Sequence, residues 1–170
     1  MRLSRFTTYL MGQIAEAADP AIDLAVTFAD DTDQFHDKPA GVRFRFATGA
    51  QIYVQTVRAS PPGGDVGGER IVEGAAALPP VTLPRLDVTS GKVDVAAFEG
   101  WLAAVVTNGG SREITRVRRH SLGEGKTSVR RPGISVDFHS GAEICLLFVY
   151  TLSAGQPLRA DREYITTERI

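Results

Sequence analysis

The feature that most constrains the fold is a correspondence between the two halves of the chain at an offset of 92 residues. Segment 41–52 aligns without a gap with segment 133–144, and the leading helical patterns align in the same register. The identical pairs in these segments are Gly41 with Gly133, Phe46 with Phe138, Gly49 with Gly141, Ala50 with Ala142 and Ile52 with Ile144. We interpret the correspondence as an internal duplication. The alternative is two unrelated hairpins that share a Ser/Thr-Gly-Ala turn.

A helix is predicted at the start of each half, over residues 4–18 and 95–107, where apolar residues recur at helical spacing. The first should end before Pro20, because proline disfavours helix in the residue that precedes it. Asp94 is the expected N-cap of the second helix, and the Asn-Gly-Gly sequence at 108–110 is the expected stop.

Each half then contains a predicted β-hairpin, over residues 41–58 and 133–152. Gly49 lies in the first turn, where it can adopt the positive φ that a tight hairpin requires. The apolar run 144–149 in the second hairpin shows no alternation, which is typical of a strand buried on both faces.

The remaining segments are less regular. Residues 21–28 fit helix or strand, 112–122 predict a charged strand, and 163–168 predict a last strand. Gly and Pro dominate 60–69, a loop composition, and three prolines mark 79–92 as an extended linker.

These patterns predict an α+β fold made of two tandem α-(β)-β-β repeats related by a pseudo-two-fold, with antiparallel sheets packed on one helix each. The expected units are residues 1–78 and 93–170, joined by the Pro-containing linker 79–92.

Charge is distributed oppositely in the two halves, although the chain as a whole has a net charge of −1. Residues 6–37 contain no Lys or Arg, and the corresponding part of the second half is rich in Arg. The acidic face comprises Asp19, Asp23, Asp30, Asp31, Asp33 and Asp37; the basic face comprises Arg112, Arg116, Arg118, Arg119, Arg130 and Arg131. Opposite charges at equivalent positions suit head-to-tail contact between copies, which generates rings or filaments. The alternative is two solvated loops without a partner.

Motifs that carry chemistry are weak or missing. The sequence GEGKT at 123–127 resembles the end of a phosphate-binding loop but lacks the preceding glycine, so a hairpin turn is the better interpretation. The acidic loop 31–37 has Phe35 where a cation site needs an oxygen ligand. We therefore expect no cofactor and no metal.

An acid–base site is conceivable around the second hairpin turn, from Asp137, His139 and Glu143. Their counterparts in the first half are Arg, Ala and Gln, which excludes a symmetric site. Cys145 lies in the most apolar strand and is interpreted as a buried small hydrophobe. We expect no catalytic residue.

These observations lead to the hypothesis of a non-enzymatic structural protein that assembles into a homo-oligomer through its acidic and basic faces, together with other assembly proteins. A phage virion component, at the head–tail connector or in the tail, is its concrete form. One alternative is a monomeric or dimeric regulatory or immunity-type binding module. Another is a nucleic-acid binder using the Arg-rich run 112–131. The longest apolar run is too short to span a bilayer, so we expect a cytoplasmic or virion location and no membrane partner.

Overall fold

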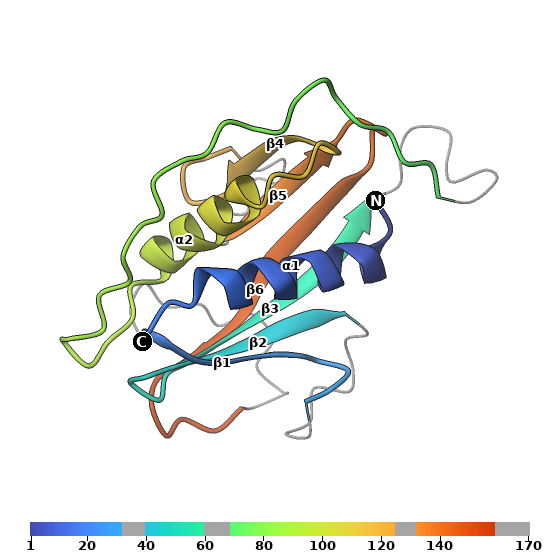
Figure 1. The fold of residues 1–170 in the computed structure, drawn as a ribbon. Coiled ribbons are helices and arrows are strands. Elements are labelled where there is room, and N and C mark those ends of the chain that lie inside the picture. The colour runs from blue at the N-terminus through green and yellow to red at the C-terminus, as the bar shows by residue number, and fades with distance from the viewer. Residues whose placement is uncertain (32–39, 60–68, 125–131, 159–170) are drawn as a thin grey trace.

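The computed structural model describes residues 1–31, 40–59, 69–124 and 132–158 (Figure 1). Helices α1 (Leu3–Ala17) and α2 (Val95–Asn108) lie side by side on one face of a twisted six-stranded sheet. The strands are β1 (Ile22–Thr27), β2 (Gly41–Phe46), β3 (Gln51–Ala59), β4 (Ile114–Arg119), β5 (Gly133–Phe138) and β6 (Glu143–Leu152). The fold is α+β, as predicted.

The strands form one sheet in the order β1-β2-β3-β6-β5-β4, and every neighbouring pair is antiparallel. We predicted antiparallel sheets packed on one helix each, and here the structure differs. The two hairpins merge because β3 and β6 pair along their length, from Gln51 opposite Leu152 to Ala59 opposite Glu143. This central position explains why β6 is apolar on both sides, as its sequence predicted.

The local signals in the sequence account for most element boundaries. Gly49 has a φ of 83° and its counterpart Gly141 one of 80°, as the two hairpin turns require. The Asp94 carboxylate accepts a hydrogen bond of 2.9 Å from the Ala97 amide and caps α2. The undecided segment 21–28 contains β1, and the predicted strand at 163–168 lies outside the described residues.

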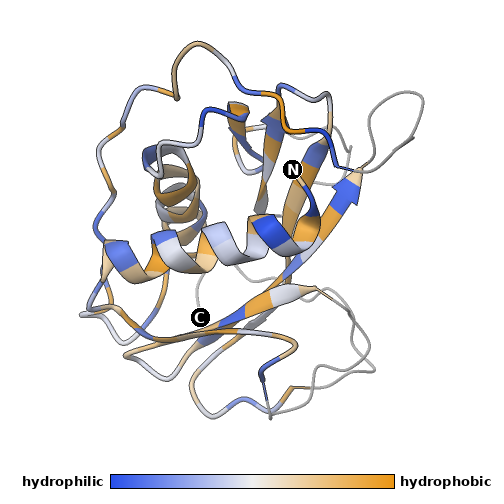
Figure 2. Ribbon diagram, turned by 45° about the vertical axis from the view of Figure 1, so that its right-hand side comes forward, coloured by the Kyte–Doolittle hydropathy of each residue, from blue (hydrophilic) through white to orange (hydrophobic). Residues whose placement is uncertain are grey.

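The core lies between the two helices and the sheet and is centred on Phe98 of α2. Figure 2 shows the hydrophobic residues along these helices and strands. The Phe98 ring stacks on Trp101 at 5.7 Å and meets Phe44 and Phe46 edge-on at 4.9 and 5.1 Å. The Tyr9 hydroxyl of α1 donates to the Val106 carbonyl of α2 at 2.9 Å, which links the two helices. One layer of apolar side chains therefore holds both helices against both hairpins.

The described part of the connection between β3 and α2, residues 69–94, contains no helix or strand and passes over the outside of the molecule (Figure 1). Side chains attach it to both halves. The Asn108 side chain donates to the Val81 carbonyl and accepts from the Val81 amide, at 2.8 and 2.7 Å. The Arg5 guanidinium bonds Glu69 at 2.7 Å. The predicted linker 79–92 belongs to this extended segment.

Candidate assembly interface

The described residues of the two charged segments lie in or directly beside the two edge strands of the sheet. The strand order places β1 at one edge and β4 at the other (Figure 1). Within the described ranges, each pairs with only one strand, β1 with β2 and β4 with β5. Each ladder is interrupted by a β-bulge, between Ile22 and Leu24 and between Ile114 and Arg116. The edges therefore resemble one another in backbone and differ in charge.

The described carboxylates of the acidic face have different surroundings. Asp23 and Asp30 are exposed, and Asp23 forms an ion pair with Arg45 of β2 at 2.7 Å. The half-buried Asp19 accepts from the Ala21 amide at 2.9 Å, which orders the turn into β1. Asp33 and Asp37 lie outside the described residues. Two exposed carboxylates thus flank this edge.

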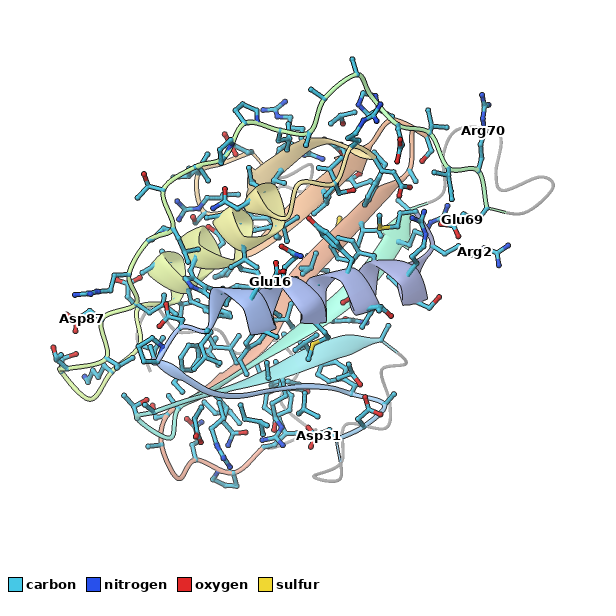
Figure 3. The ribbon with its side chains drawn as sticks, in the orientation of Figure 1. Arg2, Glu16, Asp31, Glu69, Arg70 and Asp87 are labelled. Carbon is cyan, nitrogen blue, oxygen red and sulfur yellow. The ribbon has the colours of Figure 1, made fainter. Side chains whose placement is uncertain are left out.

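Asp31 serves a structural purpose. Its side chain is only 2% exposed and accepts two hydrogen bonds from the Arg43 guanidinium, which is itself 6% exposed. A buried ion pair with this bidentate geometry is a specific anchor for the end of the edge segment. Asp31 is directed into the molecule in this way (Figure 3), and the sequence alone does not distinguish it from its exposed neighbour Asp30.

The arginines of the basic face also differ in exposure and in the groups that they bind. Arg116 is exposed and has no ion pair with any described residue. Arg112 is exposed and donates to the Gly74 carbonyl at 2.8 Å. Arg119 bonds the fully buried carboxylate of Glu99 in α2 at 3.2 Å, which ties β4 to the helix. Arg130 and Arg131 lie outside the described residues.

Arg118 is the buried member of the basic face. Its guanidinium donates to Asp137 of β5 at 2.9 Å and to Glu143 of β6 at 2.5 Å, and its side chain is 7% exposed. The hydrogen bond to the Asp137 carboxylate raises the pKa of Arg118 above its ordinary value, against the opposing effect of burial. Arg118 therefore joins β4, β5 and β6 through bonds within the chain.

Two of the three residues of the proposed acid–base site, Asp137 and Glu143, lie opposite one another in the β5–β6 ladder. Asp137 and Glu143 share Arg118, whereas the exposed His139 lies against the connecting segment at Gly74. Both carboxylates are therefore hydrogen-bonded to one guanidinium in this structure.

A second line of polar residues was missed in the sequence. His120 contacts the Ser135 hydroxyl at 2.9 Å, and that hydroxyl contacts the Cys145 sulfur at 3.3 Å. Burial raises the pKa of the Cys145 thiol, so the sulfur is protonated at neutral pH and poorly nucleophilic. His120 and Ser135 are both buried, and this line therefore satisfies polar groups on the sheet. The alternation of Ser135 with Ile134 and Val136 was its only signal in the sequence.

An open groove of about 410 Å³ runs between α1 and the edge strand β1. Apolar side chains form most of its lining, from Met11, Ile14 and Ala15 on the helix and Ile22, Leu24 and Ala25 on the strand. Asp19 and Asp23 also line the groove. The sequence indicated the carboxylates but gave no sign of the groove, because it depends on how α1 crosses the edge strand.

Other site chemistries find little support in the described residues. No three or more of their His, Cys, Asp and Glu side chains group as a metal site would require. The phosphate-loop resemblance falls partly outside these residues, and Gly123 occupies a turn with a φ of 77°. Neither helix in the described part of the chain is long and apolar enough to cross a bilayer. Within the described residues, the features suited to binding include the exposed edges, the groove beside β1 and a cavity of about 370 Å³ at the start of α2, lined by Arg85, Asp87 and Lys92 among others.

These features define an α+β protein in which, among the described residues, the edge strands β1 and β4 each pair on one side only and carry opposite charges. Comparison of the chain with models of protein families, with curated proteins and with solved structures finds no match.

Proposed function

We propose that the chain is a non-enzymatic structural protein that assembles head to tail, with β4 of one copy adding to β1 of the next. The observation that carries the proposal is the strand order, since it puts the acidic and basic segments at opposite edges of one sheet. The outward main-chain N–H and C=O groups of an edge strand bind water when the edge is free. An added strand forms main-chain hydrogen bonds with these groups instead. A component of a phage virion is the concrete form of this proposal.

The direction of the strands supports this mode of addition. Six strands that alternate in direction leave β4 antiparallel to β1. A second copy placed beside the first with its helices on the same face therefore presents β1 antiparallel to the first copy's β4. The antiparallel hydrogen-bond pattern and the layer of helices would both continue across the junction. Because two different edges meet, the contact is heterologous, as rings and filaments require.

Charge determines which edges can meet. Pairing of two β1 edges would bring the carboxylates of Asp23 and Asp30 from both copies to one junction, and pairing of two β4 edges would do the same with Arg112 and Arg116. Like charges directly opposite one another destabilise a strand pair, and opposite charges stabilise it. The mixed β1–β4 junction is the combination that avoids repulsion.

We include in the proposal that the two edges arose by duplication, with a pseudo-two-fold between the halves. The strand registers support it, because they recur at the 92-residue offset seen in the sequence. Ile22 pairs with Phe46 as Ile114 pairs with Phe138, and a bulge follows Ile22 and Ile114 alike. Bulges tend to be conserved within protein families. Because the β1–β2 and β4–β5 ladders share both the residue pairing and the position of the bulge, a common origin of the two halves is favoured over two unrelated hairpins.

A pair of close backbone approaches gives independent support to the duplication. A methyl group added at Gly41 would lie 2.4 Å from the Val54 carbonyl oxygen, and one at Gly133 would lie 2.4 Å from the Leu146 carbonyl oxygen. Val54 and Leu146 are themselves separated by the same offset. Units 1–78 and 93–170, joined by 79–92, remain the proposed division of the chain.

The test is the mass of the assembly in solution at two salt concentrations. At about 0.1 M NaCl the Debye length is about 10 Å, and at about 1 M it is about 3 Å. We expect a multi-subunit particle at the lower concentration and smaller species at the higher, measured by light scattering or sedimentation velocity. A monomer at low salt would refute the proposal.

Charge reversal supplies the matched control. Arg116→Glu should reduce the particle mass at low salt, because it places a negative charge on the β4 edge. Arg70→Glu changes an exposed arginine on the connecting segment, far from the acidic edge marked by Asp31 (Figure 3), and should leave the mass unchanged. Equal effects of both variants would contradict an edge-specific contact.

A further inference from the structure

Leu122 is the most exposed large hydrophobic side chain in the described part of the chain, at 64%. It lies in the turn that directly follows the edge strand β4. This turn is held by hydrogen bonds from the Gly123 amide to the His120 carbonyl at 2.9 Å and from the Glu124 amide to the Arg119 carbonyl at 3.3 Å. An apolar side chain is thus presented to solvent from an ordered position beside a binding edge.

The turn lies on the face of the sheet that carries the helices. The Ser121 amide donates to the Glu99 carboxylate of α2 at 3.0 Å, and the Ser121 hydroxyl donates to the same carboxylate. The groove between α1 and β1 lies on this face as well, because α1 forms one of its walls. Leu122 and the groove are therefore at opposite edges of one molecule and on the same face.

Head-to-tail addition brings these two features together. Antiparallel pairing of β4 with β1 along their full lengths sets the Arg119 end of one strand beside the Ile22 end of the other. The turn that carries Leu122 then lies beside Asp19 and Pro20, which line the groove at the start of β1. The same pairing sets Arg112, before β4, near Asp30, after β1.

We infer that the Leu122 side chain of one copy inserts into the α1–β1 groove of the next copy, and this rests on the proposed head-to-tail function. The occupant is a second copy of this chain because its β4 edge carries the positive charge that suits the carboxylates in the groove. Met11 and Leu24 supply half-buried apolar surface for the leucine. The insertion fixes the register of β4 of one copy against β1 of the next. Charge pairing alone would allow more than one register.

Substitution of Leu122 tests the energetic part of the inference. Because full burial of a leucine side chain contributes well over a factor of ten in affinity, Leu122→Asp should weaken each junction at least about tenfold in dissociation constant. Ile71→Asp is the matched control, since Ile71 is 61% exposed and lies on the connecting segment. Fluorescence of the single tryptophan, Trp101, verifies that both variants fold.

A cross-link tests the contact itself. In a Cys145→Ala background, one chain carries Leu122→Cys and a second carries Ala15→Cys, on the exposed side of the groove. We expect a disulfide between the two chains on mild oxidation after mixing. A chain with Ile71→Cys should give none with the Ala15→Cys chain.

The outcomes separate the two proposals. If the wild-type protein assembles, Leu122→Asp weakens assembly and the cross-link forms, the inference stands. If the wild-type protein assembles, but the Leu122→Asp variant assembles with the same dissociation constant and no cross-link forms, the inference is wrong. The proposal of head-to-tail assembly would still stand. If the wild-type protein is a monomer at low salt, both are wrong.

Discussion

Replacing Arg118 by alanine would remove the cation that joins β4, β5 and β6. The variant loses two hydrogen bonds of 2.9 Å to Asp137, one of 2.5 Å to Glu143 and one of 2.9 Å to the Glu124 carbonyl. Nothing in the alanine side chain replaces these donors. The carboxylates left behind would face one another across the strands without a counter-charge.

The magnitude follows from the burial of these carboxylates. Removing one partner of a buried ion pair costs about 3–5 kcal/mol, because the remaining charge is desolvated and uncompensated. The Glu143 side chain is only 11% exposed, whereas that of Asp137 is 28% exposed and regains part of its hydration. We therefore expect a loss near the lower limit, about 3 kcal/mol.

Urea denaturation followed by the emission of the fully buried Trp101 measures this loss. With a denaturant slope of about 2 kcal/mol/M, the midpoint should fall by about 1.5 M. Arg116→Ala, two residues earlier on the same strand but exposed, should change the free energy of unfolding by less than about 0.5 kcal/mol. Glu143→Gln added to Arg118→Ala should recover part of the loss, because a buried neutral amide needs no counter-charge.

A different result would refute the reasoning. If Arg118→Ala and Arg116→Ala lower the midpoint equally, or if Arg118→Ala costs less than about 1 kcal/mol, then Arg118 does not bind buried carboxylates. It would instead be a surface cation, and the basic face would regain a member available to partners or nucleic acid.

Three further measurements test other parts of the fold. Gly41→Ala should destabilise the protein by about 1–3 kcal/mol through contact with the Val54 carbonyl, whereas Gly12→Ala, in open space on α1, should stabilise it by about 0.5–1 kcal/mol; equal effects in denaturation would contradict the packing. Asp94→Ala should cost about 1 kcal/mol by removing the cap of α2, and no change in melting temperature would rule out that cap. Burial raises the pKa of Tyr9 to about 12 from an ordinary value of 10.0, so absorbance titration should find a tyrosine that ionises well above pH 10. The folded state holds this proton to higher pH than the unfolded chain, so the contribution of Tyr9 to stability is full below pH 10 and lost as pH rises through about 12; a titration in which every tyrosine has its midpoint near pH 10 would exclude this.

Much of the fold was predictable because its signals are local. Apolar spacing located both helices, and the glycines of two tight turns located both hairpins. Segment 21–28 resisted assignment because it forms a bulged edge strand, whose side chains are mostly half-buried and give no clear alternation. The union of the hairpins into one sheet was not predictable, since pairing of β3 with β6 joins strands far apart in the chain.

The candidate interface was predictable in charge but not in detail. The sequence placed opposite charges in matching segments, yet it could not separate Asp31 and Arg118, which form buried ion pairs, from exposed neighbours of the same type. Such pairs depend on residues brought together from other strands, Arg43 for one and Glu143 for the other. The proposed contact between Leu122 and the apolar groove follows from the strand order, which the sequence alone does not show.

The pairing of β3 with β6 also has a kinetic consequence. Each hairpin closes over a short turn, whereas Ala59 meets Glu143 only after the intervening chain has been brought around. Contacts between residues remote in sequence slow folding, because the loop entropy is lost before the contact is gained. We expect the hairpins to form early and their joining to limit the rate. Doubling the length of the connecting loop would add only about 0.6 kcal/mol of closure entropy, so the protein should tolerate insertions there with slower folding and nearly unchanged equilibrium stability.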